Sequence, residues 1–381
     1  MTPSRESTSD GKADPGGTSR DQVGQQSAVT REGQRLHGIF LHTGWRSGGT
    51  WVWSRFRALE TVTAFYEPLS TLLGDLSLAD IPVVRPTSNS GHPPLDAPYY
   101  EEYRSFLQER TRGVVGYRKR FGIDRFGDAP DDEFPAMQAY LQNLCDRSIE
   151  QGKVPVLKFC RSQGRLPWLK RAFPEAIHVF VLRNPAAQFA SGWLLKQEWG
   201  NAFFVAAPFR VLGLNHTQPV VKQAIEACGV RLPSVTPTSV DEYAAACEQY
   251  AHTVEGTNAY RAFVALWILC ASRMLDGVDL LIDMDRLGQC SAYASELHAQ
   301  FRTQTNATPD MEGARDLVEE AKLGIGRMTG IDGRLLRAIN FSAQKFLLSQ
   351  VDSSCDSQTR LADVIRAKLT LADEISGQWR Y

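Results

Sequence analysis

The sequence lacks an excess of charge of either sign. Its 42 Lys and Arg residues stand against 43 Asp and Glu residues, which leaves a formal net charge of −1. A general nucleic-acid-binding protein needs surplus Lys and Arg to displace the counterions of the phosphate backbone. We therefore expect no nucleic-acid partner, whereas one local basic pocket is compatible with the overall balance.

Paired cysteines and long hydrophobic runs are also missing. The seven cysteines are scattered, with no Cys-x-x-Cys pair and no His at zinc-site spacing, which is typical of reduced thiols in a cytosolic protein. The longest apolar run, residues 262–271, is too short to cross a bilayer, and the N-terminus has no apolar core of a signal peptide. These absences predict a cytoplasmic protein with no transmembrane segment and no resident metal. They leave its oligomeric state open.

The first 35 residues contain few apolar side chains and no aromatic ones. Such a segment cannot bury enough surface to offset the entropy that is lost on ordering. We predict a disordered tail over residues 1–35 and one domain over residues 36–381, which are ample for a buried core.

Beyond the tail, short apolar runs alternate with helical patterns. Strands are predicted over 36–42, 62–66, 154–159, 177–182 and 278–282, and helices over 50–60, 165–173, 185–198 and 260–275. This alternation predicts an α/β fold with a central parallel sheet flanked by helices. An insertion over 81–150 is expected to combine a proline-rich loop (81–98) with helices over 99–112 and 133–150, and to shape a pocket.

A glycine-rich loop follows the first predicted strand, with the sequence Gly44-Trp45-Arg46-Ser47-Gly48-Gly49-Thr50-Trp51. Glycines between a strand and a helix let successive amides point into one concavity, where the helix N-terminus and a cation favour a phosphate. The spacing is similar to a Walker A loop, but Thr50 stands where that motif has Lys. Taken alone, the loop is also compatible with a turn that binds nothing.

This loop resembles the 5′-phosphosulfate loop of sulfotransferases that use 3′-phosphoadenosine 5′-phosphosulfate (PAPS). Arg46, Ser47, Gly48, Gly49, Thr50 and Trp51 fill the places of that family's basic residue, its small and hydroxyl residues and its Trp. The resemblance implies a P-loop-like three-layer fold and PAPS as co-substrate. It also implies that Arg46 stabilises the transferred group and that Trp51 stacks on adenine, although a buried helix Trp is the alternative.

A second motif has the layout of the family's 3′-phosphate site. Strand 177–182 ends in Arg183-Asn184-Pro185, and Ser191 follows one helix along. A guanidinium offers a fork to phosphate oxygens, and a hydroxyl adds a further donor. The resemblance therefore assigns Arg183 and Ser191 to the nucleotide.

Candidate catalytic groups follow two other strands. Tyr66-Glu67-Pro68-Leu69 is similar to an acidic segment of carbohydrate sulfotransferases, which implies a general base at Glu67 and an acceptor hydroxyl on a carbohydrate or glycolipid. A solvated turn carboxylate is the alternative for Glu67. Lys158 ends the 154–159 strand, where the family has a basic residue near the sulfuryl group. Arg161 and Arg165 are either additional anion ligands or exposed loop cations.

Two departures from the cytosolic branch of the family limit the resemblance. Cys160 stands where that branch has a His after Lys158, and its late Arg-Lys-Gly loop is matched only loosely by residues 322–327. His42 and His178 are expected in the core, and Asp283 and Asp285 in a structural turn. Two other functions stay open, namely a P-loop kinase acting on a small metabolite and a non-catalytic nucleotide-binding module.

Overall fold

The computed structural model describes residues 38–85, 95–122, 126–127, 131–235 and 239–377, so that the predicted tail (1–35) lies outside the described residues. Five parallel strands form one sheet in the order β2-β3-β1-β4-β5. Their bounds are Ile39–Thr43 (β1), Val62–Tyr66 (β2), Val154–Phe159 (β3), Ile177–Leu182 (β4) and Leu280–Asp283 (β5). The predicted α/β class with a central parallel sheet is confirmed.

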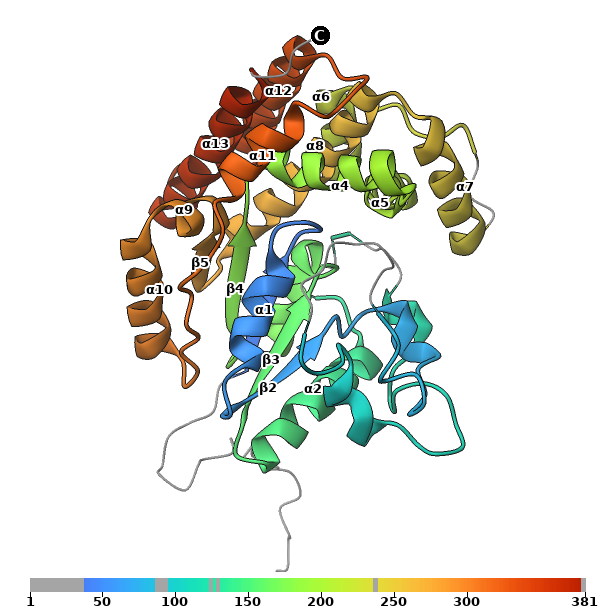
Figure 1. Cartoon of the computed structure of the whole chain (residues 1–381), viewed down its shortest axis with the longest axis vertical. Helices are drawn as coiled ribbons and strands as arrows, with labels where there is room; N and C mark the ends of the chain where they lie inside the picture. The colour runs from blue at the N-terminus through green and yellow to red at the C-terminus, as the bar shows by residue number, and fades with distance from the viewer. Residues whose placement is uncertain (1–37, 86–94, 123–125, 128–130, 236–238, 378–381) are drawn as a thin grey trace, which may run out of the picture.

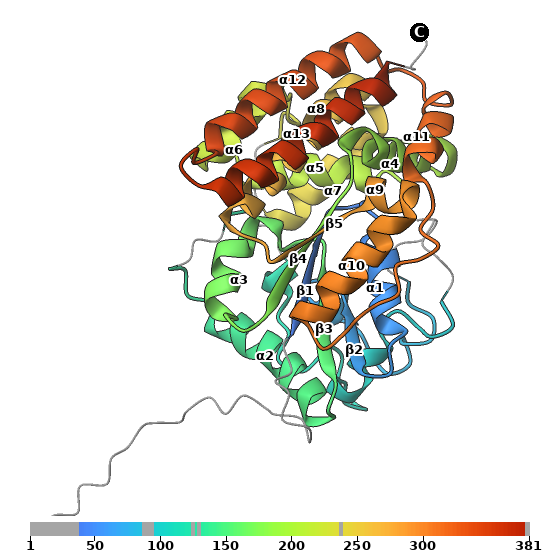
Figure 2. The same ribbon diagram turned by 90° about the vertical axis from the view of Figure 1, so that its left-hand side faces the viewer.

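Helices cover both faces of this sheet, which makes three layers (Figure 2). Helices α1 (Gly49–Arg57) and α10 (Ser291–Gln304) lie on one face, where the rings of Phe56 and Phe301 are 5.3 Å apart. Helices α2 (Pro135–Glu150) and α3 (Leu166–Ala172) lie on the other. Because both faces are covered, every residue of β1 and of β3 is buried, and these strands are nearly continuous apolar runs rather than alternating ones.

A second, helical half stands over the carboxyl ends of the strands (Figure 1). It comprises α4 (Pro185–Trp199), α5 (Phe203–Leu214), α6 (Pro219–Cys228), α7 (Val240–Thr253), α8 (Gly256–Arg273), α9 (Met284–Gln289), α11 (Leu317–Ile325), α12 (Gly333–Gln350) and α13 (Asp356–Ser376). The apolar stripe predicted over 260–275 is the buried side of α8. Helices α5 to α7 were not predicted from the sequence.

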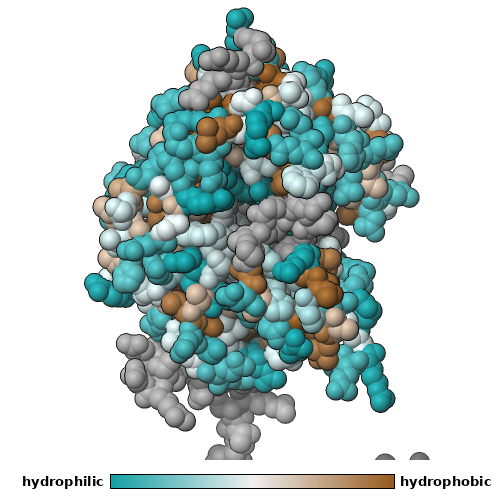
Figure 3. All heavy atoms as spheres, viewed as in Figure 1, coloured by the Kyte–Doolittle hydropathy of each residue, from teal (hydrophilic) through white to brown (hydrophobic). Residues whose placement is uncertain are grey.

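Helix α12 packs on both α8 and α13, which ties the end of the described chain to the core of this half. Within the described residues, no helix combines the length and the apolar composition that a membrane crossing requires. On the face shown in Figure 3, hydrophobic side chains are scattered among hydrophilic ones, as is usual for a globular surface.

The insertion differs from its prediction. Helix α2 confirms the helix predicted over 133–150, but the helix predicted over 99–112 is wrong, since only a 3₁₀ helix, η2 (Glu101–Phe106), forms there. Its buried side chains, Tyr103 and Phe106, and that of the preceding Tyr100 recur every third residue. That spacing suits a 3₁₀ helix, in which residues i and i+3 lie directly above one another. Four shorter 3₁₀ turns are η1 (Thr71–Gly74), η3 (Lys119–Gly122), η4 (Gln163–Arg165) and η5 (Met274–Asp276).

Strand order places the glycine-rich loop at the reversal point of the sheet. From β1 the chain proceeds to β2 and β3 on one side, and then crosses to β4 and β5 on the other. In open α/β sheets, the crevice at the carboxyl ends of the strands next to such a reversal is where ligands bind. The loop after β1 therefore lies where the fold offers its binding site.

Candidate functional site

A cleft of about 1190 Å³ lies over the carboxyl ends of the strands and extends under the helical half. It is lined by the loop after β1, by the ends of β2, β3 and β4, and by parts of α4, α5 and α11. Most of the residues predicted from the sequence line it together: Arg46, Gly48, Gly49, Thr50, Trp51, Glu67, Lys158, Arg183 and Ser191. Ser47, also predicted, is buried in the same loop but is not among the lining residues.

The loop is shaped by its glycines. Gly48 has φ 90° and caps the N-terminus of α1, a conformation that favours glycine. A Cβ on Gly49 would lie 2.5 Å from Cγ2 of Thr43, so only glycine fits against the end of β1. Among the described residues, no acceptor takes a hydrogen bond from the amides of Gly48, Gly49 or Thr50. The loop and the helix N-terminus therefore present donors to a ligand.

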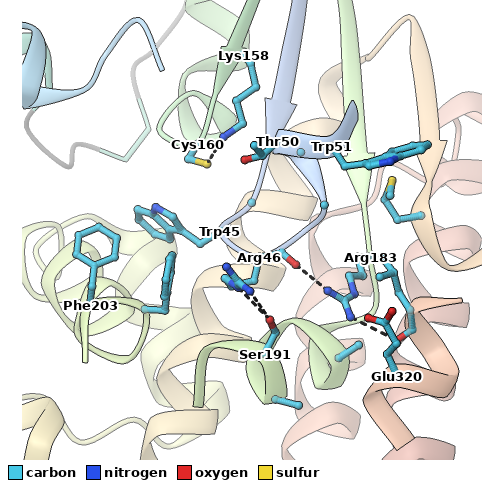
Figure 4. Close-up of a pocket in the computed structure, with 18 of the residues that line it drawn as sticks. Trp45, Arg46, Thr50, Trp51, Lys158, Cys160, Arg183, Ser191, Phe203 and Glu320 are labelled. Carbon is cyan, nitrogen blue, oxygen red and sulfur yellow. Dashed lines mark hydrogen bonds between the residues drawn. The ribbon is translucent and has the colours of Figure 1, made fainter. Parts of the chain in front are cut away.

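Arg46 lies at the centre of the cleft (Figure 4). Its Nε and Nη2 donate to Oγ of Ser191 at 2.9 and 2.7 Å, and its guanidinium lies 5.1 Å from the ring centre of Phe204. Burial lowers the pKa of Arg46 to about 10, although Tyr66 opposes that shift. The backbone of Arg46 has φ 64°, in the left-handed region that non-glycine residues seldom adopt.

Arg183 approaches the same loop from the end of β4. Its Nη1 donates to the carbonyl oxygen of Arg46 at 3.0 Å, and its Nη2 donates to that of Leu317 at 3.3 Å. Within the described part of the chain, its Nε and the Oγ of Ser47 are buried without a hydrogen bond. Burial lowers the pKa of Arg183 to about 10, Asp285 opposes that shift, and Arg46 adds to it. A buried cation whose direct partners are neutral carbonyls is poised for an anion.

Glu67 and Lys158 form a buried ion pair at the ends of β2 and β3. Lys158 Nζ donates to Glu67 Oε1 at 2.5 Å, and the Cys160 amide donates to Glu67 Oε2 at 3.1 Å. Glu67 has φ 49°; among the described residues, it and Arg46 are the two non-glycine residues with positive φ. Such backbone strain costs about 1–3 kcal/mol per residue and gathers at functional sites. The solvated carboxylate considered for Glu67 is excluded, since Glu67 is only 6% exposed.

The charges of this pair support each other. Burial alone would raise the pKa of Glu67, but the nearby Lys158 and Arg161 outweigh it and lower the pKa. Burial would likewise lower the pKa of Lys158, but attraction to Cys160, Glu67 and Tyr66 raises it well above its usual value. The carboxylate and the ammonium are therefore both charged at neutral pH. The Cys160 thiol stays protonated because burial and Glu67 raise its pKa to about 11.

Two further residues of α1 face the cleft. Thr50 Oγ1 lies 3.1 Å from the hydroxyl of Tyr66, which ties the loop to the end of β2. Trp51 is partly exposed and lines the cleft, with the guanidinium of Arg55 5.5 Å from its ring centre. The alternative of a buried helix Trp does not hold for Trp51, and its ring is available for stacking.

Of the two additional arginines, one belongs to the cleft and one does not. Arg161 lines the cleft, 3.9 Å from Glu67 Oε2. Arg165 is neither an exposed loop cation nor a lining residue, because its side chain is buried and donates to the Phe121 carbonyl. The sequence alone does not show which of the two arginines lines the cleft, because their directions depend on the η4 turn.

The expected structural residues are found in the core. His42 and His178 are buried and lie 2.9 Å apart, from Nε2 to Nδ1, and burial lowers the pKa of His178 to about 4. Asp283 caps α9 and pairs with Lys368 at 2.5 Å, while Asp285 accepts from the side chain of Asn184 at 2.7 Å. Both acids therefore hold the strand ends in place.

Several lining residues were missed by the sequence reasoning: Trp45, Tyr100, Phe203, Phe204, Arg315 and Glu320. They come from segments far apart in the chain, and no local motif marks them. The loosely matched segment 322–327 does contribute, through Leu323, Gly324 and Arg327. Within the described ranges, no group of three or more His, Cys, Asp or Glu side chains is placed to hold a metal ion.

Searches against protein-family models, curated proteins and solved structures found no match for this chain. The case for a function therefore depends on the residues of the cleft itself.

Proposed function

We propose that the protein is a sulfotransferase, which transfers a sulfuryl group from PAPS to an acceptor hydroxyl on a carbohydrate or glycolipid. The observation that supports this most directly is that two arginines, Arg46 and Arg183, line the same cleft at two different places. Arg46 lies in a loop whose Gly48, Gly49 and Thr50 amides have no acceptor among the described residues, and Arg183 lies beside it with a buried Nε that has no partner among those residues either. PAPS carries anions at both its 5′ and 3′ positions, which suits two such places.

In this proposal, the amides of Gly48, Gly49 and Thr50 and the Arg46 guanidinium bind the 5′-phosphosulfate. Arg183 and Ser191 bind the 3′-phosphate, and Trp51 stacks on adenine. Charge-assisted hydrogen bonds of this kind contribute about 1.5–3 kcal/mol each. Ser191 already accepts from Arg46, which holds the guanidinium between the two anion positions.

Transfer is proposed to be an in-line displacement at sulfur. The acceptor oxygen forms a new S–O bond while the bond from sulfur to the 5′-phosphate oxygen breaks, and adenosine 3′,5′-bisphosphate leaves. The acceptor proton passes to Glu67. Arg46, Lys158 and the loop amides stabilise the charge that develops on the departing phosphate. Like phosphoryl transfer, this reaction depends mainly on placement and electrostatics.

In this proposal, the ion pair keeps Glu67 from acting as a base until Lys158 has turned to the sulfuryl group. While Lys158 holds it, Glu67 has a lowered pKa and is a weak base. If Lys158 turns to the sulfuryl group, Glu67 loses that stabilisation, and its burial then raises its basicity. The proposal includes a cytoplasmic location, which the seven free cysteines support.

The test combines binding with turnover. Adenosine 3′,5′-bisphosphate should raise the melting temperature of the protein, and PAPS should give bisphosphate when acceptors are supplied. Arg183→Ala should remove most of the thermal shift. Glu67→Gln should keep the shift and lose turnover. A thermal shift that is unchanged in Arg183→Ala, or ATP consumption that depends on magnesium in place of sulfate transfer, would contradict the proposal.

A further inference from the structure

Aromatic side chains gather on one side of the cleft, where Trp45 also borders a smaller pocket that it shares with Cys160 and Arg161. Trp45 and Phe203 are both half-buried and line the cleft, with ring centres 6.4 Å apart at an interplanar angle of 87°. Phe204 packs against Phe203 at 5.2 Å, and Arg210 lies over the ring of Phe203 at 5.6 Å. We call the right angle made by Trp45 and Phe203 the aromatic corner.

The aromatic corner lies away from the proposed nucleotide site. Figure 4 shows Trp45 and Phe203 on one side of Arg46, and Trp51 and Arg183 on the other. A donor that spans the loop and Arg183 leaves the Trp45 side open. Trp45 and Cys160 line one smaller pocket together, and Lys158 donates to the Cys160 sulfur, so a molecule held on that side would extend toward the catalytic pair.

Polar groups line the cleft near the same pair. Tyr100 is fully buried, and its hydroxyl lies close enough to the Ser70 side chain for a hydrogen bond between them to lower its pKa, against the larger opposite effect of burial. Its ring lies 6.0 Å from that of Tyr66, the residue before Glu67. The side chains of Ser70 and Thr71 line the cleft with it. A phenol or alcohol hydroxyl both donates and accepts, so this group of hydroxyls can exchange hydrogen bonds with a polar ligand.

We propose that the aromatic corner and Tyr100 form the acceptor subsite, and that its ligand is a pyranose ring. A pyranose has an apolar C–H face, which packs on an aromatic ring, and a rim of hydroxyls, which suits Tyr100, Ser70 and Thr71. Arranged in this way, one rim hydroxyl faces Glu67. This inference rests on the proposed sulfotransferase function; it narrows the carbohydrate acceptor to a pyranose ring and names the residues that select it.

The test uses direct binding, so that it does not require the natural acceptor. Methyl pyranosides of glucose, galactose, mannose and N-acetylglucosamine are examined by saturation-transfer NMR, with the protein saturated with adenosine 3′,5′-bisphosphate. We expect ring C–H signals from at least one pyranoside. Trp45→Ala and Phe203→Ala should reduce them to background, and Tyr100→Phe should weaken binding by about two- to tenfold, as for one lost hydrogen bond.

Trp199→Ala is the matched control, because Trp199 is 63% exposed and is not among the lining residues. It should leave the signals unchanged, and every variant should keep the thermal shift with bisphosphate, which shows that it is folded. Wild-type protein that binds bisphosphate but no pyranoside, or binding that survives in Trp45→Ala, would overturn the inference alone. Absence of any bisphosphate binding would overturn the proposed function and this inference with it.

Discussion

The two ends of the cleft treat positive charge in different ways. At one end, Lys158 is held by the Glu67 carboxylate, with Cys160 and Tyr66 around it. At the other, Arg183 is also buried, but its direct partners are two backbone carbonyls, and Asp285 acts on it only as a nearby charge. At the first end, the buried lysine has a carboxylate as its direct partner, and Arg161 lies 3.9 Å from the same carboxylate. At the second end, the direct partners of the buried arginine are neutral, so an anion bound there would supply the opposite charge that the described residues do not place in contact with it.

This difference suits two separate roles, with the ion pair serving the reaction and the buried arginine serving anion binding. A balanced pair keeps its geometry without a ligand and supplies groups that exchange protons or charge during a reaction. An unbalanced buried cation is costly until an anion arrives, so its cost is offset by binding. Among the described residues, the two non-glycine residues with left-handed backbone are Glu67, at the first end, and Arg46, at the centre of the cleft.

The largest expected effect is on stability, at the first end. Lys158→Met removes the partner of a buried carboxylate and should lower the free energy of unfolding by about 3–5 kcal/mol. Arg183→Met should lower the free energy of unfolding much less, because it removes a buried charge that has no ionic partner, together with two hydrogen bonds. Urea unfolding of both variants without ligand measures the contrast.

The double variant Lys158→Met/Glu67→Gln controls for the loss of side-chain packing. It should regain most of the stability, because the buried carboxylate is neutralised together with the loss of its lysine partner. Equal destabilisation by Lys158→Met and Arg183→Met would show that the two ends do not differ as described.

The next effect is on anion binding, at the other end. Arg183→Met should weaken the binding of adenosine 3′,5′-bisphosphate by about 3 kcal/mol or more, which is over a hundredfold, since two charge-assisted hydrogen bonds are lost. Isothermal titration calorimetry measures the dissociation constant. Arg327→Gln, which removes a 61% exposed cation that also lines the cleft, is the control and should have a small effect. Comparable losses in both variants would mean that the cleft attracts anions by overall charge alone.

Some of this contrast could be predicted from the sequence and some could not. The loop and Arg183 each follow a predicted strand, and parallel strands bring their carboxyl ends together, so these residues were expected in one cleft. That Glu67 is buried against Lys158 depends on β2 and β3 being neighbours, and the strand order is not encoded in either motif. Trp45 and Phe203 meet only because α5 folds over the loop, which no local pattern specifies. Both the Glu67–Lys158 pair and the Trp45–Phe203 contact therefore depend on long-range packing, which the sequence motifs do not specify.

A change at Arg161 should alter the pH dependence of turnover. The pKa of Glu67 lies below its usual 4.5, so the carboxylate persists in mild acid, and the acid limb of kcat/KM should lie below that value. Arg161→Gln removes the second of the two cations that lower this pKa, so the limb should move to higher pH. The pH profile of bisphosphate release from PAPS measures it. Lys322→Gln, which removes a partly exposed charge not among the lining residues, is the control. An unmoved limb in Arg161→Gln would argue against Glu67 as the base.

The smallest expected effect comes from the acid that faces the second end. Glu320 lines the cleft, pairs with Arg315 at 3.2 Å and acts on Arg183 as a nearby negative charge. Its side chain is 43% exposed, so solvent screens it, and such charges contribute about 0.2–1 kcal/mol. Glu320→Gln should therefore tighten bisphosphate binding by up to about fivefold, because one repulsive charge is gone and Arg315 is released toward the ligand. Glu319→Gln, its neighbour that pairs with Lys322 outside the cleft, should leave the affinity unchanged. Weaker binding in Glu320→Gln would mean that Glu320 positions a cation for the ligand, and that the charge at this end is less in excess than the direct contacts of Arg183 indicate.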